Sequence, residues 1–296
     1  MNDLKGYFII LYKQKKIIIL STILFGLCLL SISYVLNNKY ESESIILVKT
    51  PSNGGNVGTI NNFNLGNIDV LGSANKGSYL QRSLAFFYSI ELARIIEEDK
   101  ETLMHLFAVN GYDNENNQSI LNNEIYNLET DEWSRNKPSP FNGRPLDIEI
   151  LRELKSILNV YYNSNSGFIE IKVRSNSPLA AYQLAENFIN FANNFIVKQD
   201  LAEIDRALFL TDQLASQNIA NIKLQDSLTL IREENLKKKI YIQSNANFPL
   251  QKVQSPYVDI NRVFPNRIFF ILLGFILGFI ISSTLIILRL SNTQLK

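Results

Sequence analysis

Two apolar segments without charged residues set the main limit on how this chain can fold. They cover residues 17–36 and 268–288, and each matches the ~20 residues that a helix needs to cross ~30 Å of hydrocarbon. Tyr34 lies near one end, and Lys16 and Arg289 stand just outside the segments. Aromatic rings and basic residues favour these positions at membrane boundaries. The sequence therefore predicts two transmembrane helices.

Basic residues before the first span predict its orientation. There are four lysines in this short stretch, namely Lys5, Lys13, Lys15 and Lys16. An excess of positive charge places a flank in the cytoplasm. Arg262 and Arg267 argue mildly for the opposite orientation, but they end a long segment, where the rule has less weight. We expect residues 1–16 and 289–296 in the cytoplasm and 37–267 on the other side of the membrane.

Composition excludes several classes of function. A net charge of +1 does not suit a nucleic-acid-binding surface. One cysteine, Cys28, and one histidine, His105, are too few for a disulfide framework or a zinc cluster. The sequence also lacks the Gly-x-Ser-x-Gly motif of a nucleophile elbow. We therefore expect no enzymatic activity, no catalytic residues, no cofactor, no metal site and no nucleic-acid partner.

Helical and strand patterns alternate between the spans, which predicts an α+β domain. Apolar residues recur every three or four positions, as in amphipathic helices, over residues 79–98 and 147–158. Residues 40–48 start with alternation and end in β-rich Ile-Ile-Leu-Val, and residues 168–173 alternate after the first pair, so both are predicted strands. The polar segment 112–145 is predicted to be an irregular insertion, and we assign it no role.

A long helix is predicted over residues 178–239. Ser177 and Pro178 supply an N-cap and a first-turn proline. Between Pro178 and Pro249 the sequence contains neither glycine nor a further proline. At 1.5 Å per residue, a continuous helix would reach roughly 90 Å.

One stripe of this helix has the three-and-four spacing of a helix packed lengthwise on another helix. It contains leucines with two amides between them: Leu210, Leu214, Gln217, Asn221 and Leu224. Two interpretations stay open. The stripe packs against a partner within the chain, or it forms a subunit contact in which buried amides fix the register.

Prolines and glycines mark the rest of the chain. Pro249, Pro256 and Pro265 predict a stiff, non-helical strut leading to the second span. Within that span, Gly274 and Gly278 form Gly-x-x-x-Gly, a surface that lets another helix approach closely, within the subunit or between subunits. The alternative is ordinary lipid-facing packing, because glycine is common in spans.

These features together resemble a known family. They include the first span followed by Tyr-Glu and a strand, and the segment Ile169-Glu-Ile-Lys-Val-Arg-Ser-Asn-Ser-Pro-Leu-Ala180. The long helix, the strut ending Pro265-Asn-Arg267 and the glycine-bearing second span complete the pattern. The whole layout is similar to that of the Wzz-type polysaccharide co-polymerases, which are chain length determinants of bacterial surface polysaccharides.

The resemblance implies a fold and a function. It implies a periplasmic, membrane-proximal α/β base, here 37–177 with 240–267, and a helical extension, 178–239, between two inner-membrane spans. It further implies ring-like homo-oligomers that set O-antigen length in lipopolysaccharide beside a Wzy-type polymerase. The ring would either recruit that polymerase or hold the growing lipid-linked polysaccharide.

Alternative functions are weighed against this layout. A role as a capsule or exopolysaccharide chain-length or export adaptor is the main alternative, and a two-span membrane sensor is another. Only residues 289–296 follow the second span, without a Walker motif, so the fused tyrosine kinase of some relatives is not expected in this chain.

Overall fold

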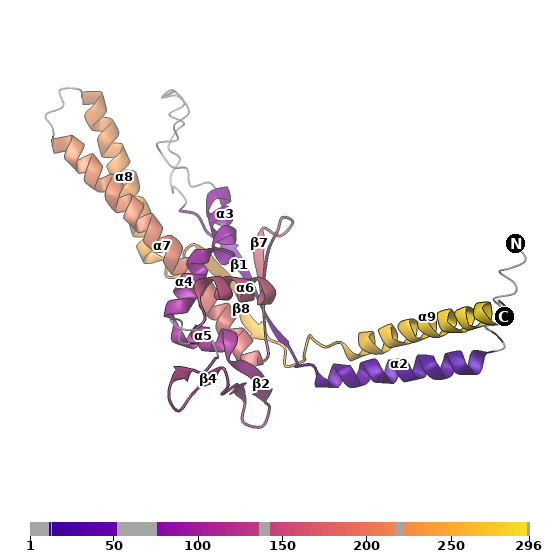
Figure 1. The fold of residues 1–296 in the computed structure, drawn as a ribbon. Helices are drawn as coiled ribbons and strands as arrows, with labels where there is room; N and C mark the ends of the chain where they lie inside the picture. Colours follow the sequence, from indigo (N-terminus) through magenta and orange to yellow (C-terminus); the bar gives the residue numbers. More distant parts are fainter. Residues whose placement is uncertain (1–11, 13, 52–75, 136–142, 217–221, 295–296) are drawn as a thin grey trace, which may run out of the picture. The chain divides into compact units, whose positions relative to one another are not determined.

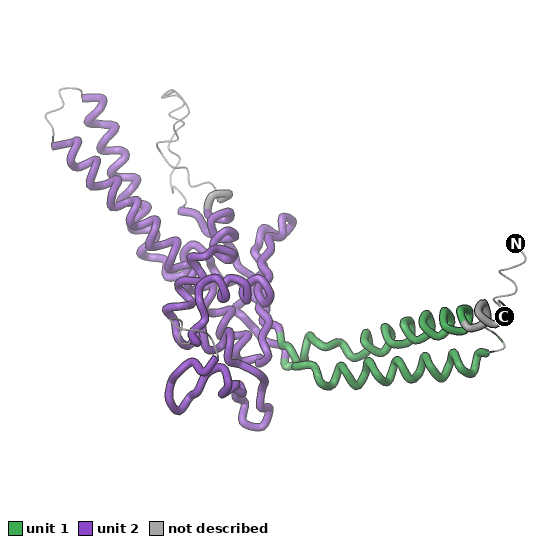
Figure 2. Tube along the Cα trace, viewed as in Figure 1, with its two compact units in different colours: residues 1–40, 260–296 green, residues 41–259 purple. Residues whose placement is uncertain are grey.

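The computed structural model describes the chain except residues 1–11, 13, 52–75, 136–142, 217–221 and 295–296. The chain forms two compact units, one made of residues 1–40 and 260–296 and the other of residues 41–259 (Figure 2). The mixed helix and strand composition, with an apolar helix near each end of the chain, confirms the predicted fold class.

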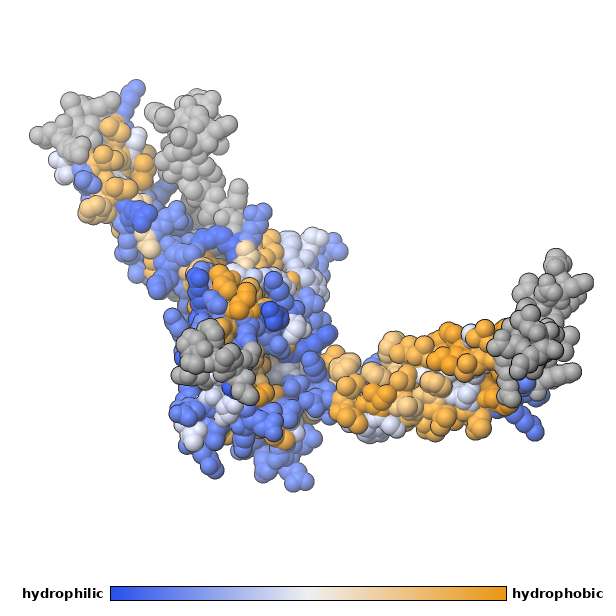
Figure 3. Space-filling model, viewed as in Figure 1, coloured by the Kyte–Doolittle hydropathy of each residue, from blue (hydrophilic) through white to orange (hydrophobic). Residues whose placement is uncertain are grey.

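The first unit is a pair of helices, α2 (Lys15–Val35) and α9 (Arg267–Gln294). Both are long and apolar enough to cross a membrane, and Figure 3 shows apolar residues along the visible face of the pair. The helices agree with the predicted spans, although α9 continues beyond residue 288. Gly278 lies near Thr22, and Gly274 lies near Gly26, so the two helices run antiparallel.

The second unit is built on a four-stranded sheet in the order β6–β7–β1–β8 (Figure 1). The strands are β6 (Leu158–Asn163), β7 (Phe168–Ser175), β1 (Tyr40–Val48) and β8 (Leu250–Val258). β6 pairs antiparallel with β7, and β1 pairs antiparallel with β8. Every second residue of β1 is buried, as expected of a strand with one face against the core.

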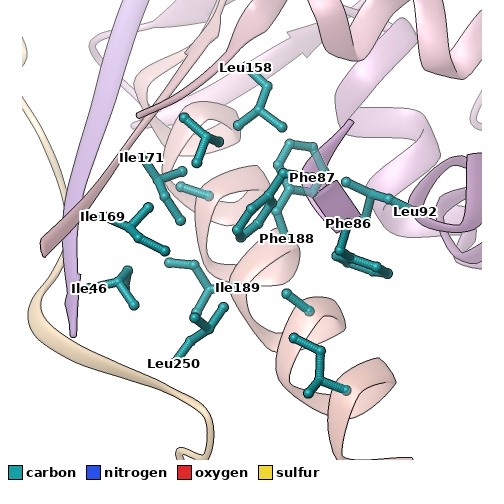
Figure 4. Packing of buried hydrophobic residues seen from close by; sticks show 14 of the residues in the cluster. Ile46, Phe86, Phe87, Leu92, Leu158, Ile169, Ile171, Phe188, Ile189 and Leu250 are labelled. Carbon is teal, nitrogen blue, oxygen red and sulfur yellow. The ribbon is translucent and has the colours of Figure 1, made fainter. Parts of the chain in front are cut away.

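Helices cover the buried face of this sheet. They are α3 (Lys76–Phe87), α4 (Ile90–Glu98), α5 (Lys100–Phe107), α6 (Asp147–Ile157) and the first half of α7 (Pro178–Ser216). Of these, α3, α6 and α7 contact the sheet, while α4 packs on α6 and α5 packs on α7. In Figure 4, Phe188 and Ile189 of α7 lie between sheet residues such as Ile46 and Ile171 and the aromatic rings of α3. All of these side chains are buried. α7 is therefore the central helix of the core.

The single helix predicted over residues 79–98 is wrong, because the chain turns between Phe87 and Ile90. Ser89 caps the new helix: its side-chain oxygen accepts a hydrogen bond from the Leu92 amide at 3.3 Å. A serine cap satisfies an amide that the start of a helix leaves without a partner. The break lets α3 and α4 each turn an apolar face to the core.

The continuous helix predicted over residues 178–239 is also wrong. α7 ends at Ser216, and α8 (Ile222–Ser244) returns beside it. Two ion pairs between the helices show that they run antiparallel: Lys239 Nζ lies 2.7 Å from Asp205 Oδ1, and Arg232 Nε lies 3.2 Å from Asp212 Oδ1. The extension is therefore a helical hairpin formed by the second half of α7 with α8 (Figure 1). The first half of α7 belongs to the base.

The segment 112–145 is more regular than predicted. It contributes to two small antiparallel ladders, β2 (Val109–Asp113) with β3 (Gln118–Leu121), and β4 (Tyr126–Asn127) with β5 (Glu132–Trp133). In the second ladder, the Tyr126 ring packs edge-on against Trp133, with centroids 5.0 Å apart. Cross-strand aromatic contacts of this kind stabilise short ladders.

Candidate functional site

The two glycines of the second span lie where the backbones of α2 and α9 meet. A Cβ atom added to Gly274 would lie 2.7 Å from the Gly26 Cα and 2.9 Å from the Phe25 carbonyl oxygen. A Cβ atom on Gly278 would lie 2.9 Å from the Thr22 Cα. These distances leave no room for a side chain, so the glycines permit close approach of the other span of the same chain. Their effect on assembly stays a prediction.

Gly26 completes this contact, and the sequence reasoning missed it. The Phe275 ring lies over Gly26, and a Cβ atom there would be 2.3 Å from the ring. Gly26 stands alone in the first span, without a second glycine four residues away, so it carries no Gly-x-x-x-Gly signal. It becomes visible only when the two helices are placed together.

Backbone and side-chain contacts connect the segment that follows α2 with the segment that precedes α9. The Lys39 amide donates to the Phe264 carbonyl at 2.9 Å, and the Val263 amide donates to the Lys39 carbonyl at 2.8 Å. The Arg267 guanidinium carbon lies 3.8 Å from the centroid of the Tyr34 ring, a cation–π contact. These contacts hold the end of α2 next to the start of α9.

The stripe predicted on the long helix falls on the hairpin. Leu210, Leu214 and Leu224 are 50%, 46% and 45% exposed, so the pairing of α7 with α8 covers them only in part. Gln217 and Asn221 lie outside the described residues. Ile204 and Leu228 are buried, and the register of the two ion pairs places Leu228 opposite the outer end of α7. The hairpin thus closes part of its own seam and leaves other apolar side chains half-exposed, and Figure 3 shows apolar residues gathered on it.

The proline segment is extended, and most of it forms an edge strand. Pro256 lies within β8, which has β1 on one side and, in the four-stranded sheet, no neighbour on the other. The β1–β8 register shifts on both sides of Ile45, so the ladder is irregular near this proline. An edge and a bulge are where a sheet tolerates a residue without an amide hydrogen. The mechanical role of Pro249, Pro256 and Pro265 stays a prediction.

Asn193 fastens α7 to the start of this strand. Its Nδ2 donates to the Leu250 carbonyl at 3.1 Å, and its Oδ1 accepts from the Leu250 amide at 2.8 Å. Leu250 follows Pro249 directly and is fully buried. One buried amide side chain therefore satisfies both backbone groups of a residue in the core.

A buried carboxylate fastens α3 to α7. Asp200 is 1% exposed; its Oδ2 accepts a hydrogen bond from the Tyr79 hydroxyl at 2.5 Å, and its Oδ1 lies 2.7 Å from Arg82 Nη1. Burial, followed by this hydrogen bond, raises the pKa of Tyr79 far above its usual range. No sequence pattern indicates this cluster, because Asp200 lies 121 residues from Tyr79 and 118 residues from Arg82 along the chain.

The only histidine is part of the packed base. His105 is 8% exposed, and its Nε2 lies 3.7 Å from a Glu101 carboxylate oxygen. Burial lowers the pKa of His105, although Glu101 and Asp99 oppose this effect. Within the described part of the chain, no group of histidine, cysteine, aspartate and glutamate is arranged to hold a metal ion. The features that stand out are thus surfaces for packing helices.

Comparison with known proteins agrees with these features at the amino-terminal end. Residues 2–85 match the family model described as Wzz, chain length determinant protein. The match spans α2 and β1 and confirms the resemblance predicted from the sequence. No curated protein matches the chain. A solved structure described as a full-length bacterial polysaccharide co-polymerase is similar, with a TM-score of 0.42 and 13% identity over 97% of each chain. The two apolar helices and the Wzz match support an inner-membrane protein.

Proposed function

We propose that this chain is a Wzz-type polysaccharide co-polymerase that sets the chain length of O-antigen in lipopolysaccharide. The observation that carries the proposal is the Wzz match over residues 2–85. The architecture supports it, because two span-length helices flank an α/β unit from which a helical hairpin extends. In this proposal residues 37–267 lie in the periplasm and both chain ends lie in the cytoplasm.

The proposed mechanism is scaffolding without bond-making chemistry. Copies of the chain form a ring, and the ring either recruits a Wzy-type polymerase or holds the growing lipid-linked glycan. The half-exposed leucines of the hairpin support contact between copies, because apolar side chains gathered on a protruding element favour association. The exposed parts of Leu210, Leu214 and Leu224 are the surface that another copy would cover in such a contact.

Gene deletion and complementation test the function. Cells lacking the gene should make the same polysaccharide repeat with an altered ladder of lengths on a gel, and the wild-type gene should restore the ladder. Unchanged ladders in the deletion strain would overturn the proposal. The gel also separates the alternatives: a shift in capsular or exopolysaccharide length with unaltered lipopolysaccharide would assign the chain to that polymer instead.

A pair of matched variants tests the scaffold. Leu210→Gln changes an exposed apolar residue on the hairpin, and Ile120→Gln changes one of equal exposure, 50%, on β3. The first should reduce the oligomer mass in detergent and shift the ladder, while the second should do neither. If both variants behave alike, the hairpin has no special part in assembly.

A further inference from the structure

The paired spans carry an apolar groove at the end where α2 begins. It is lined by Ile18, Ile19, Thr22 and Ile23 of α2 and by Phe275 and Phe279 of α9, with Lys15 at its mouth. From Lys15 to Ile23 the groove follows about 12 Å of helix at 1.5 Å per residue. This depth is close to half of the ~30 Å hydrocarbon core of a bilayer, which is the share of one leaflet.

The walls of this groove offer an occupant no polar partner inside the membrane. The Thr22 hydroxyl donates to the Ile18 carbonyl at 2.7 Å, so it is already satisfied within the helix. Every other lining residue apart from Lys15 is aliphatic or aromatic. Only an apolar occupant suits such walls, because an unsatisfied polar group is costly in hydrocarbon.

The side chains also favour a flexible occupant over a third helix. Close packing between spans uses small residues, and here Gly26, Gly274 and Gly278 are already occupied by the contact between α2 and α9. The groove is walled instead by branched and aromatic side chains. A flexible chain fills an uneven surface of this kind better than a rigid helix does.

Charge at the mouth indicates the head group. Neither α2 nor α9 contains an aspartate or glutamate, so the span pair itself does not neutralise Lys15. The Lys15 Nζ lies 4.5 Å from the centroid of the Tyr12 ring, at the level where interfacial aromatic residues are expected. A basic residue beside an opening between spans suits an anionic lipid head group.

We propose that this groove binds one acyl chain of an anionic phospholipid, whose phosphate pairs with Lys15. The proposal depends on the helices spanning a membrane and does not depend on the polysaccharide function. It makes a bound lipid part of the packing of the two spans.

Native mass spectrometry of the full chain, released from nanodiscs, tests the site. The nanodiscs contain equal amounts of phosphatidylglycerol and phosphatidylcholine with identical acyl chains. The wild type should retain phosphatidylglycerol preferentially. Lys15→Gln should reduce this preference about fivefold, which corresponds to the ~1 kcal/mol of one basic residue near an anionic surface. Lys16→Gln, on an exposed neighbour outside the groove, is the matched control.

A second pair of variants tests the groove itself. Ile23→Trp should fill it and reduce lipid retention, whereas Ile32→Trp, at a residue of α2 with similar exposure (45% against 47%), should not. Equal effects of the two lysine variants, or of the two tryptophan variants, would overturn the proposal. So would Ile23→Trp lowering the oligomer mass with lipid retention unchanged, because the groove would then hold a span of a second copy. An unaltered polysaccharide ladder in these variants would not contradict lipid binding, because the lipid proposal does not depend on the polysaccharide function.

Discussion

Alanine substitution of Gly274, Gly278 or Gly26 should weaken the packing of the two spans. The ranking of the three variants should not follow the distance of the added Cβ atom to its nearest neighbour. At Gly274 the added Cβ would lie 2.7 Å from backbone, against 3.4 Å for the near limit of ordinary contact, so the helices must move apart by about 0.7 Å. Overpacking of this kind costs about 1–3 kcal/mol, and Gly274→Ala should lie near the upper end. Gly278→Ala, with contacts at 2.9 Å, should follow.

Gly26→Ala should be the mildest of the three although its nearest contact, 2.3 Å, is the shortest. The atoms it meets belong to the Phe275 ring, which can turn at a cost of about 0.5–1.5 kcal/mol. A backbone atom has no such freedom, because the whole helix must move with it.

Energy transfer between dyes on Gln14→Cys and Leu288→Cys, in a Cys28→Ser background, would report the separation of the spans. The purified chain in mild detergent is titrated with SDS, and the midpoint is compared among variants. Thr284→Val, at an exposed position of α9, is the control and should leave the midpoint unchanged. A midpoint as in wild type for Gly274→Ala, or the largest loss for Gly26→Ala, would refute the argument.

Three further predictions concern the rest of the chain. The first concerns topology, tested in the Cys28→Ser background. Glu129→Cys, exposed between β4 and β5, should be labelled from the periplasm, and Asn2→Cys should be labelled only after lysis. The reverse pattern would contradict the predicted orientation. The second concerns the buried carboxylate of the core. Asp200→Asn should lower the free energy of unfolding by about 1–3 kcal/mol, measured by Trp133 fluorescence. Asp212→Asn, in an exposed ion pair, should lower it by at most about 0.5 kcal/mol. The third concerns acidity. The folded-state pKa of His105 is lowered, so the unfolded chain binds the proton more readily and stability should fall as pH drops below about 6.5. His105→Leu should flatten this dependence, and a slope equal to that of wild type would contradict it.

The sequence predicted correctly those elements whose pattern of apolar residues directly matches what surrounds them. The spans are apolar on all sides, and burial alternates along β1 and most of β7 because one face of the sheet is buried. The hairpin was missed for a local reason. Residues 217–221 contain neither glycine nor proline, the strongest turn signals, and the weaker turn formers Asn218 and Asn221 do not by themselves predict the end of a helix. The antiparallel pairing brings together residues far apart along the chain, such as Lys239 and Asp205, which a local pattern cannot predict.

The buried contacts of the base and spans were out of reach for the same reason. Asn193 pairs with Leu250, and Asp200 with Tyr79 and Arg82, across the fold. The glycines of the second span follow a known spacing, but their partner Gly26 has no motif of its own. Sequence patterns thus identify surfaces, and the pairing of surfaces depends on the fold.

The position of β8 beside β1 has a consequence for biosynthesis. Ser42 pairs with Val258 and Val48 pairs with Leu250, so the ladder joins two segments that are far apart along the chain. While the intervening residues are being made, that edge of β1 has no strand to bond and the core lacks Leu250. An unpaired edge can join the wrong strand of another chain. The sheet can therefore be completed only shortly before α9 is synthesised, and until then that edge of β1 stays open to pairing with another chain.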